Sequence, residues 1–224
     1  MRNDLFLRAI MAVGLFFSGM VIPLRAEDEN ENEKQSKWTV AFHGGWGSRI
    51  GLLPEDVDSD VLDILSRAKQ GFYGQLSIGY DLSRYFIPIG VTVKGFYSSV
   101  ERKEIPLSTS ILFVGPYFSF FKKELGRHRT LLEFGPGCLF YKSGGLASAG
   151  QTVSGAAPGF NASCYYEYKL SERMAISFSF SGTDGVLEKA NLTENGITEK
   201  IALEEEEFLS LTHWGLSLGL RYGF

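Results

Sequence analysis

The chain has 224 residues, with 22 Lys and Arg against 26 Asp and Glu, and a formal net charge of −4. This length suits a single domain, and an acidic chain lacks the clustered cations that bind nucleic-acid phosphates. Only Cys138 and Cys164 occur, which excludes a Cys-based zinc site and a scaffold held by many disulfides.

The first predicted element is a secretory signal peptide over residues 1–26. Arg2 and Arg8 flank the start of an apolar run, and Ala26 precedes an acidic stretch. This order is typical of a cleaved leader, whereas a transmembrane helix needs about 20 unbroken apolar residues. Cleavage would remove three Arg and one Asp, so the net charge would fall from −4 to −6. The polar and acidic residues 27–37 then predict a disordered periplasmic tail.

Residues 38–224 predict eight strands in which large apolar side chains alternate with small or polar ones. The expected strands lie near 38–48, 71–82, 85–99, 107–122, 129–142, 156–170, 173–183 and 207–224. The last strand is the clearest, because every second residue is large and apolar: Trp214, Leu216, Leu218, Leu220, Tyr222 and Phe224. From Ile111 to Phe121 both faces are apolar, so the sequence leaves the phase of that strand open.

The connections between these strands alternate in length. Short turns are expected near 83–84, 125–126 and 171–172, and longer loops at 49–70, 100–106, 143–155 and 184–206. Short periplasmic turns and longer outer loops are typical of outer-membrane barrels, whose apolar residues face lipid and whose small or polar residues fill the lumen. The pattern predicts an all-β fold, an eight-stranded antiparallel up-and-down transmembrane β-barrel. A soluble lipocalin-like barrel or jelly roll is the alternative, opposed by the aromatic residues near both ends of the strands.

Three segments carry a resemblance to a known family. The last strand closes in Tyr222-Gly223-Phe224, and short turns follow Tyr80-Asp81-Leu82 and Tyr168-Lys169-Leu170. These features resemble the small outer-membrane β-barrel superfamily, which holds the OmpA transmembrane domain, OmpX-like proteins and opacity-type surface proteins. The resemblance implies that the last strand is read by the barrel-assembly machinery, that periplasmic chaperones assist it, and that the barrel lies in the outer membrane of a Gram-negative bacterium.

Four charged residues fall on the small-or-polar face of the strands: Lys94, Glu133, Glu167 and Arg221. A lumen formed by about eight strands is just wide enough to be filled by side chains, and unpaired charges there would be costly. We therefore expect a charge network in which Glu133 or Glu167 holds Arg221, with Lys94 further along the lumen. A gated proton or ion path through the same groups is the alternative.

The remaining polar residues predict no catalytic residue, metal or cofactor. His43 and His213 lie on the inner face, where two His without a nearby carboxylate do not specify a metal. The acidic first loop has Val61 and Arg67 where a calcium loop needs Gly and Glu, so residues 58–69 predict a short amphipathic helix instead. The sequence also lacks the His-x-Ser-Asn arrangement expected of a barrel that acts on lipid A.

Cys138 and Cys164 share the outward phase on the fifth and sixth strands. A hairpin centred near residue 151 would place them opposite one another, and a secreted protein can form a disulfide. The sequence leaves open whether they form that bridge or remain two free thiols.

These features predict a non-enzymatic integral outer-membrane protein with an envelope-structural role or a surface-interaction role through its outer loops. Outer-membrane lipid and lipopolysaccharide are its expected surroundings, and the sequence identifies no surface partner. A small porin or a channel for hydrophobic solutes is the alternative, because one barrel design carries many functions.

Overall fold

The computed structural model describes residues 38–50, 66–81, 88–102, 105–144, 151–203 and 208–224. The expected signal peptide and periplasmic tail, residues 1–37, lie outside the described residues. Of the helix expected at 58–69, only residues 66–69 are described, and residues 66–68 form a single helical turn. In the described ranges, no helix is long and apolar enough to span a membrane.

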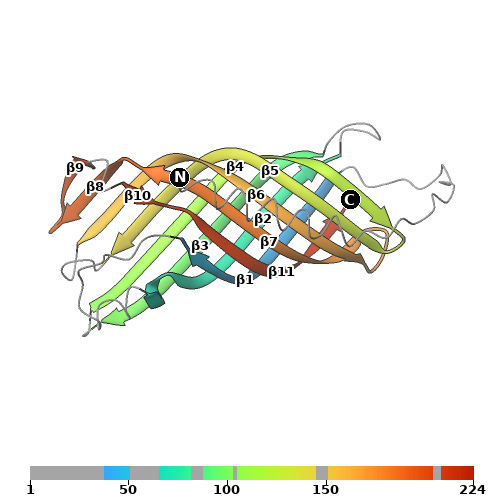
Figure 1. The fold of residues 1–224 in the computed structure, drawn as a ribbon, viewed down its shortest axis with the longest axis horizontal. Coiled ribbons are helices and arrows are strands. Elements are labelled where there is room, and N and C mark those ends of the chain that lie inside the picture. The colour runs from blue at the N-terminus through green and yellow to red at the C-terminus, as the bar shows by residue number, and fades with distance from the viewer. Residues whose placement is uncertain (1–37, 51–65, 82–87, 103–104, 145–150, 204–207) are drawn as a thin grey trace. The chain divides into compact units, whose positions relative to one another are not determined.

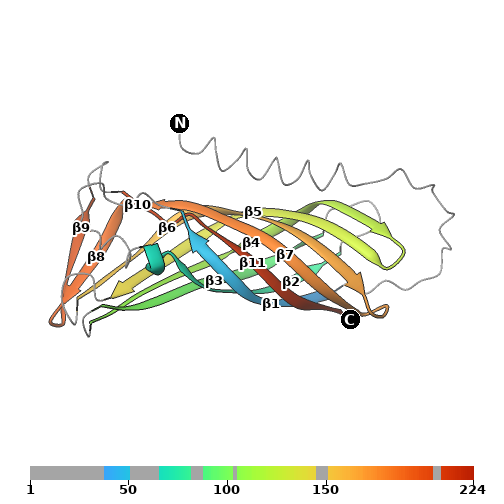
Figure 2. The same ribbon diagram turned by 60° about the horizontal axis from the view of Figure 1, so that its bottom comes forward.

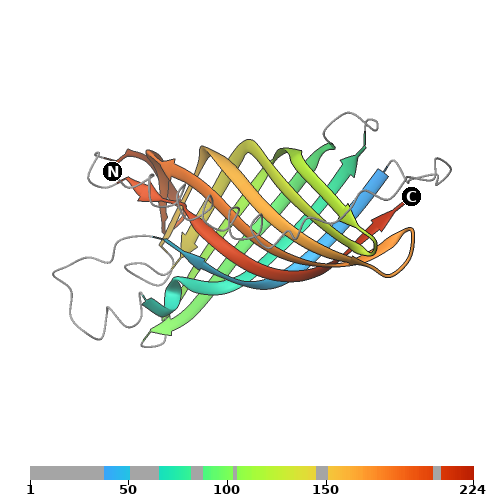
Figure 3. The same ribbon diagram turned by 45° about the vertical axis from the view of Figure 1, so that its right-hand side comes forward.

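Eight antiparallel strands close into a barrel (Figure 1), which confirms the predicted fold class. In chain order these strands are β1 (Trp38–Arg49), β2 (Gln70–Tyr80), β3 (Ile89–Arg102), β4 (Ile105–Leu125), β5 (His128–Gly144), β6 (Thr152–Lys169), β7 (Met174–Leu187) and β11 (His213–Gly223). The barrel closes where β11 pairs with β1, which lie side by side in red and blue in Figure 3. Each of the eight strands therefore has a partner on both sides.

Both termini of the barrel sequence meet at one end, which we call the terminal end. The Phe224 amide donates to the Trp38 carbonyl at 3.0 Å, and the Trp38 amide donates back at 3.3 Å. The turn between β4 and β5 lies at the same end, with Gly126 at a φ of +57°, as the first central position of a type II′ turn requires. We call the opposite end the loop end, because the β1–β2, β3–β4, β5–β6 and β7–β11 connections lie there.

The loop end differs from the loops that the sequence predicts. The expected loop at 184–206 contains a hairpin of β8 (Lys189–Glu194) and β9 (Ile197–Ala202), and β10 (Leu209–Ser210) pairs with β7. Figure 2 shows β8 and β9 at the end of the barrel away from the C-terminus. The strands extend into the expected loop at 100–106, since β3 and β4 remain paired out to Arg102 and Ile105.

A β-bulge reverses the alternation near the end of β4, the strand whose phase the sequence leaves open. Tyr117 and Ser119 point into the barrel and Phe118 points outward. The pairing with β5 shifts between Ser119 and Phe121, so Phe120 is an extra residue, and Phe120 and Phe121 are both exposed. A bulge turns two successive side chains toward one face, which keeps both rings of this apolar run outside the barrel.

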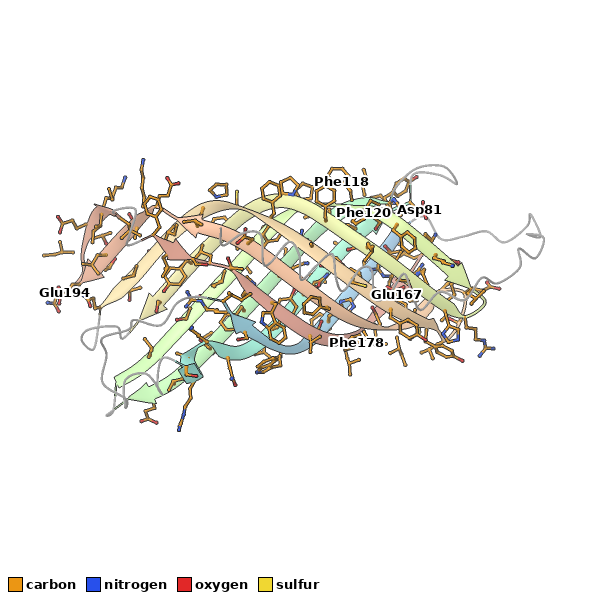
Figure 4. All side chains as sticks on the ribbon, viewed as in Figure 1. Asp81, Phe118, Phe120, Glu167, Phe178 and Glu194 are labelled. Carbon is orange, nitrogen blue, oxygen red and sulfur yellow. The ribbon has the colours of Figure 1, made fainter. Side chains whose placement is uncertain are left out.

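Apolar side chains cover the outside of the barrel. Figure 4 shows Phe118, Phe120 and Phe178 pointing away from it. More than half of the side chain is exposed at Phe42, Phe72, Val91, Tyr97, Phe120, Phe160, Leu218 and Leu220. This arrangement inverts that of a soluble protein and is the arrangement of a barrel whose solvent is lipid.

Glycines make room for the large side chains that fill the barrel. Tyr73, Phe113 and Tyr117 point inward and are almost fully buried. A Cβ built on Gly215 would lie 2.5 Å from the Tyr73 ring, and one on Gly90 would lie 2.4 Å from the Tyr117 ring. Rings on one strand therefore occupy the space that a neighbouring glycine leaves, so the lumen is filled at these levels.

Candidate functional site

The pairing of the strands brings one arginine and two glutamates together inside the barrel near the terminal end. Arg221 on β11 is paired with Ala41 on β1 and Ala175 on β7, and all three point inward. These small neighbours leave space for the long Arg221 side chain to reach past β7. It therefore meets Glu167 on β6 and Glu133 on β5, neither of which lies on an adjacent strand.

Arg221, Glu167 and Glu133 are joined by hydrogen bonds inside the barrel. Arg221 Nε donates to Glu167 Oε1 at 2.6 Å, and Arg221 Nη2 donates to Glu133 Oε1 at 3.3 Å. The exposed fraction of these side chains is 6% for Arg221, 0% for Glu167 and 2% for Glu133. The Arg221 guanidinium also lies 5.4 Å from the centre of the Tyr165 ring, within reach of a cation–π interaction.

Arg129 is a further member that the sequence analysis did not identify. Its Nε donates to Glu167 Oε2 at 2.6 Å, and its Nη2 donates to the same oxygen. Arg129 lies directly across from Glu167 in the pairing of β5 with β6. The sequence contains a signal for it, because the period of two places Arg129 on the inward face of the same strand as Glu133, four residues away.

Two cations and two anions thus form one layer, which we call the charge layer: Arg129, Glu133, Glu167 and Arg221. Its formal charge is zero, because two arginines balance two glutamates, and each carboxylate has a guanidinium nitrogen within 3.3 Å. Charges buried in a medium of low polarity are tolerated when they are paired and hydrogen-bonded. The charge layer can therefore stay ionised inside the barrel.

A second set of ion pairs surrounds the terminal end, where Figure 4 places Asp81. Lys122 lies 3.4 Å from both Asp81 and Glu124, and Lys169 Nζ lies 2.6 Å from Glu124 Oε2. Glu124 thus accepts a hydrogen bond from Lys169 and also lies within 4.0 Å of Lys122 and Arg129. These contacts keep Glu124 ionised at the mouth of the barrel.

A small cavity lies between the mouth and the charge layer. Its volume is about 30 Å³, enough for a water molecule or two. The lining residues are Thr39, Tyr80, Asp81, Pro88, Tyr117, Ser119, Lys122, Arg129, Leu131 and Arg221. The cavity therefore ends at the two arginines of the charge layer.

Lys94 stands apart from the charge layer. Its Nζ donates to Asn161 Oδ1 at 2.6 Å and also to Ser163 Oγ, and its side chain is buried. In the part of the chain that the structure describes, it forms no ion pair with a carboxylate within 4.0 Å. Lys94 therefore has neutral polar partners, whereas Glu133, Glu167 and Arg221, the other three residues of the predicted network, contact one another.

Toward the loop end the interior is apolar. Buried side chains from six strands and the connection before β11 pack there: Phe96, Ile111, Phe113, Leu139, Tyr141, Ala157, Leu187, Ala190 and Leu211, with Val153 and Leu209 at the edge. We call this the apolar core. The lumen is therefore crossed by the charge layer near the terminal end and by the apolar core near the loop end.

The two inward histidines do not meet. In the pairing of β1 with β11, His43 is opposite Gly219 and His213 is opposite Arg49, six residues further along. The His43 ring lies 5.5 Å from the Tyr165 ring, and the His213 ring lies 5.7 Å from the Phe96 ring. Among the described residues, no three His, Cys, Asp or Glu side chains gather as a metal site.

The structure has Cys138 and Cys164 as free thiols, so the possible disulfide between them is not formed. In the pairing of β5 with β6, Cys138 is opposite Pro158 and Cys164 is opposite Leu132. The hairpin is therefore centred near residue 148, midway between the paired residues 138 and 158, and not near 151. The offset is six residues, about 20 Å at 3.4 Å per residue, whereas a disulfide needs Cα atoms within about 7 Å.

We expect a maleimide reagent to label both cysteines of the unfolded, unreduced protein. Prior treatment with a reductant should leave the count of two labels unchanged, since the register holds the two sulfur atoms far apart. Mass spectrometry of the labelled protein gives this count. Fewer than two labels without reductant, restored to two by reductant, would contradict the register of β5 and β6.

Several solved structures share this fold, among them the following two. Neisserial surface protein A is 11% identical with a TM-score of 0.52, over 84% of this chain and 97% of that one. A major outer membrane protein from Thermus thermophilus is 14% identical with a TM-score of 0.56, over 84% of this chain and 99% of that one. The predicted resemblance to small outer-membrane barrels is thereby confirmed for the fold. No protein-family model and no curated protein matches the chain.

Proposed function

We propose that this protein is a non-enzymatic outer-membrane barrel that spans the membrane as a closed scaffold and presents its loop end at the cell surface. The apolar outer surface supports a membrane location, because it would be exposed to water in any soluble protein. An even number of strands places both termini on one side, and the tight β4–β5 turn at the terminal end supports a periplasmic position for that end. Residues 1–26 serve in this proposal as the signal peptide and residues 27–37 as a periplasmic tail.

In an outer-membrane barrel the last strand, β11, would also act as the recognition signal for assembly. β11 closes the barrel against β1, and its outward residues alternate with inward ones along its whole length. The apolar set that the assembly machinery would read is Trp214, Leu216, Leu218, Leu220, Tyr222 and Phe224. Periplasmic chaperones would hold the chain before this strand pairs.

The closed scaffold is supported by two sets of buried side chains that block the lumen, the charge layer and the apolar core. The charge layer has no net charge, and each of its carboxylates is held by an arginine. The apolar core blocks the same lumen a second time with buried aromatic and aliphatic side chains. A solute would have to separate ion pairs and then displace packed rings in order to pass.

A small porin is the second candidate, and buried polar groups beside the charge layer favour it. Both ring nitrogens of His43 and the hydroxyls of Ser77 and Ser177 are buried without a hydrogen-bond partner among the described residues. Buried polar groups are nearly always hydrogen-bonded, so these groups require water inside the barrel. A porin would extend that water through both closures.

Planar-bilayer recording separates the two functions. We expect the refolded barrel, confirmed as folded by its heat-modifiable migration on a gel, to insert without steady current, because both closures stay intact. Long-lived conductance steps from the unmodified protein would overturn the closed scaffold and support the porin. Absence of steps from folded, inserted protein would exclude the porin.

A further inference from the structure

On three neighbouring strands the outward side chains change from apolar to polar within one step along the strands. The pairing of β4, β5 and β6 aligns an exposed apolar row of Leu112, Phe140 and Ala156. The next outward row toward the loop end is Ser110, Lys142 and Ser154. The edge of the apolar outer surface therefore follows a single row across these strands, and Lys142 stands directly beyond it.

The hairpin of β8 and β9 continues this polar row. Ser154 on β6 is paired with Asn191 on β8, which is paired with Lys200 on β9. The following row carries hydroxyl groups, from Ser108 on β4 through Thr152, Thr193 and Thr198. We call the outward residues Ser110, Lys142, Ser154, Lys189, Asn191 and Lys200 the lysine face.

Charges on the hairpin separate by sign. The strand period of two places Lys189 and Lys200 on the outward side, which continues the outer surface of the barrel. Glu194 and Glu199 fall on the other side of the same two strands. Figure 4 shows Glu194 at the far end of the hairpin. In the described residues Lys142, Lys189 and Lys200 form no ion pair with a carboxylate, so the lysine face carries uncompensated positive charge on an acidic chain.

We propose that the lysine face binds the phosphate groups of anionic membrane lipids. This inference rests on the proposed membrane location, because the apolar outer surface must lie in the bilayer for the adjoining row to reach the headgroups. Lipid phosphates are the anions found at that boundary, and a lysine places its ammonium there while its methylene stem covers apolar surface. Ser110 and Ser154 flank Lys142 and add hydroxyl donors to the same phosphate.

The test measures lipid binding to the folded barrel in a nonionic detergent by native mass spectrometry. The probes are phosphatidic acid, phosphatidylcholine and inorganic phosphate. The double variant Lys142→Gln with Lys200→Gln removes two charges from the lysine face. We expect its affinity for phosphatidic acid to fall about 30-fold, since each lysine near an anionic lipid surface is worth about fivefold. A matched control, Arg127→Gln with Arg173→Gln, removes two exposed charges in the turns at the terminal end and should lose less than twofold.

Three outcomes would overturn the lysine face as a lipid site. They are equal binding of phosphatidic acid and phosphatidylcholine, an equal loss in the control variant, and binding of inorganic phosphate as strong as that of phosphatidic acid. The last outcome would assign the site to a free anion. Insertion of the unmodified barrel into pure phosphatidylcholine vesicles, followed by heat-modifiable migration, tests the membrane proposal separately, because these vesicles carry no net negative charge.

Discussion

Glu167→Ala is expected to lower the free energy of unfolding by about 3 to 5 kcal/mol, the cost of leaving buried charges without their partner. Glu167 is fully buried and accepts from Arg221 at one oxygen and from Arg129 at the other. Both arginines would remain charged, because a guanidinium does not lose its proton in a protein. The charge layer would then hold a net charge of +1. Urea unfolding of the refolded barrel in detergent micelles measures the change.

Two comparison variants show whether the loss comes from the charge layer. Glu172→Ala removes an exposed carboxylate in the β6–β7 turn and should change stability by no more than about 0.5 kcal/mol. Glu133→Ala should cost less than Glu167→Ala, because Glu133 accepts only at 3.3 Å from Arg221 and at 3.4 Å from Ser119. Equal losses from Glu172→Ala and Glu167→Ala would refute a specific role for the buried pair.

Net charge also predicts how a second substitution acts. Glu167→Leu with Arg221→Leu leaves Arg129 and Glu133, so the charge layer is neutral again. This double variant should be destabilised by less than the sum of its two single variants, since removing both partners leaves no excess charge. If Glu167→Ala opens a current in planar bilayers, the uncompensated +1 charge should make that current favour anions.

Alternation along the chain predicted the two faces of most strands, because side-chain direction in a strand depends only on local geometry. The inward positions of Glu133, Glu167 and Arg221 follow from this period alone. So do the outward positions of Leu218 and Phe178. The rule failed to set a phase only in β4, where both faces are apolar and where a bulge at Phe120 reverses the alternation.

Pairing between strands could not be predicted in the same way. Register depends on where each hairpin turns, and the sequence near residues 143–155 offers several small residues as turning points. A shift of the hairpin centre from 151 to 148 separates Cys138 from Cys164 by six residues. Arg129 was missed for a related reason, since its contact with Glu167 appears only once β5 is aligned with β6.

The expected loop at 184–206 contains a local signal for the hairpin of β8 and β9, the pair Asn195-Gly196. Asn195 and Gly196 adopt φ of 50° and 80°, the two positive values that a type I′ turn needs. Asn-Gly between two short runs is the strongest local signal for such a turn. The lysine face depends on this hairpin, since β8 and β9 carry Lys189 and Lys200.

Gly215→Leu is expected to destabilise the barrel by about 3 kcal/mol, at the upper end of the usual cost of overpacking. A Cβ at this position would lie 2.5 Å from the Tyr73 ring, and a leucine adds three more carbon atoms. The Tyr73 ring has little freedom to move away, because the residue is fully buried. Tyr73 is also packed closely against Gly47, since a Cβ built on Gly47 would lie only 3.2 Å from the Tyr73 Cβ. Closed pairing on both sides of β11 also prevents the backbone from moving aside.

Urea unfolding in micelles again gives the measurement, and the chain offers a matched control. Gly95→Leu places the same side chain on the outside of β3, where the nearest atom to a Cβ is on Leu112 at 4.0 Å, so stability should change by less than about 1 kcal/mol. Tyr73→Ala combined with Gly215→Leu lets the leucine occupy the space of the ring. This double variant should be about 2 kcal/mol more stable than the sum of the single effects predicts. Strict additivity would show that the ring and the glycine do not share one space, and that the lumen is not packed at this level.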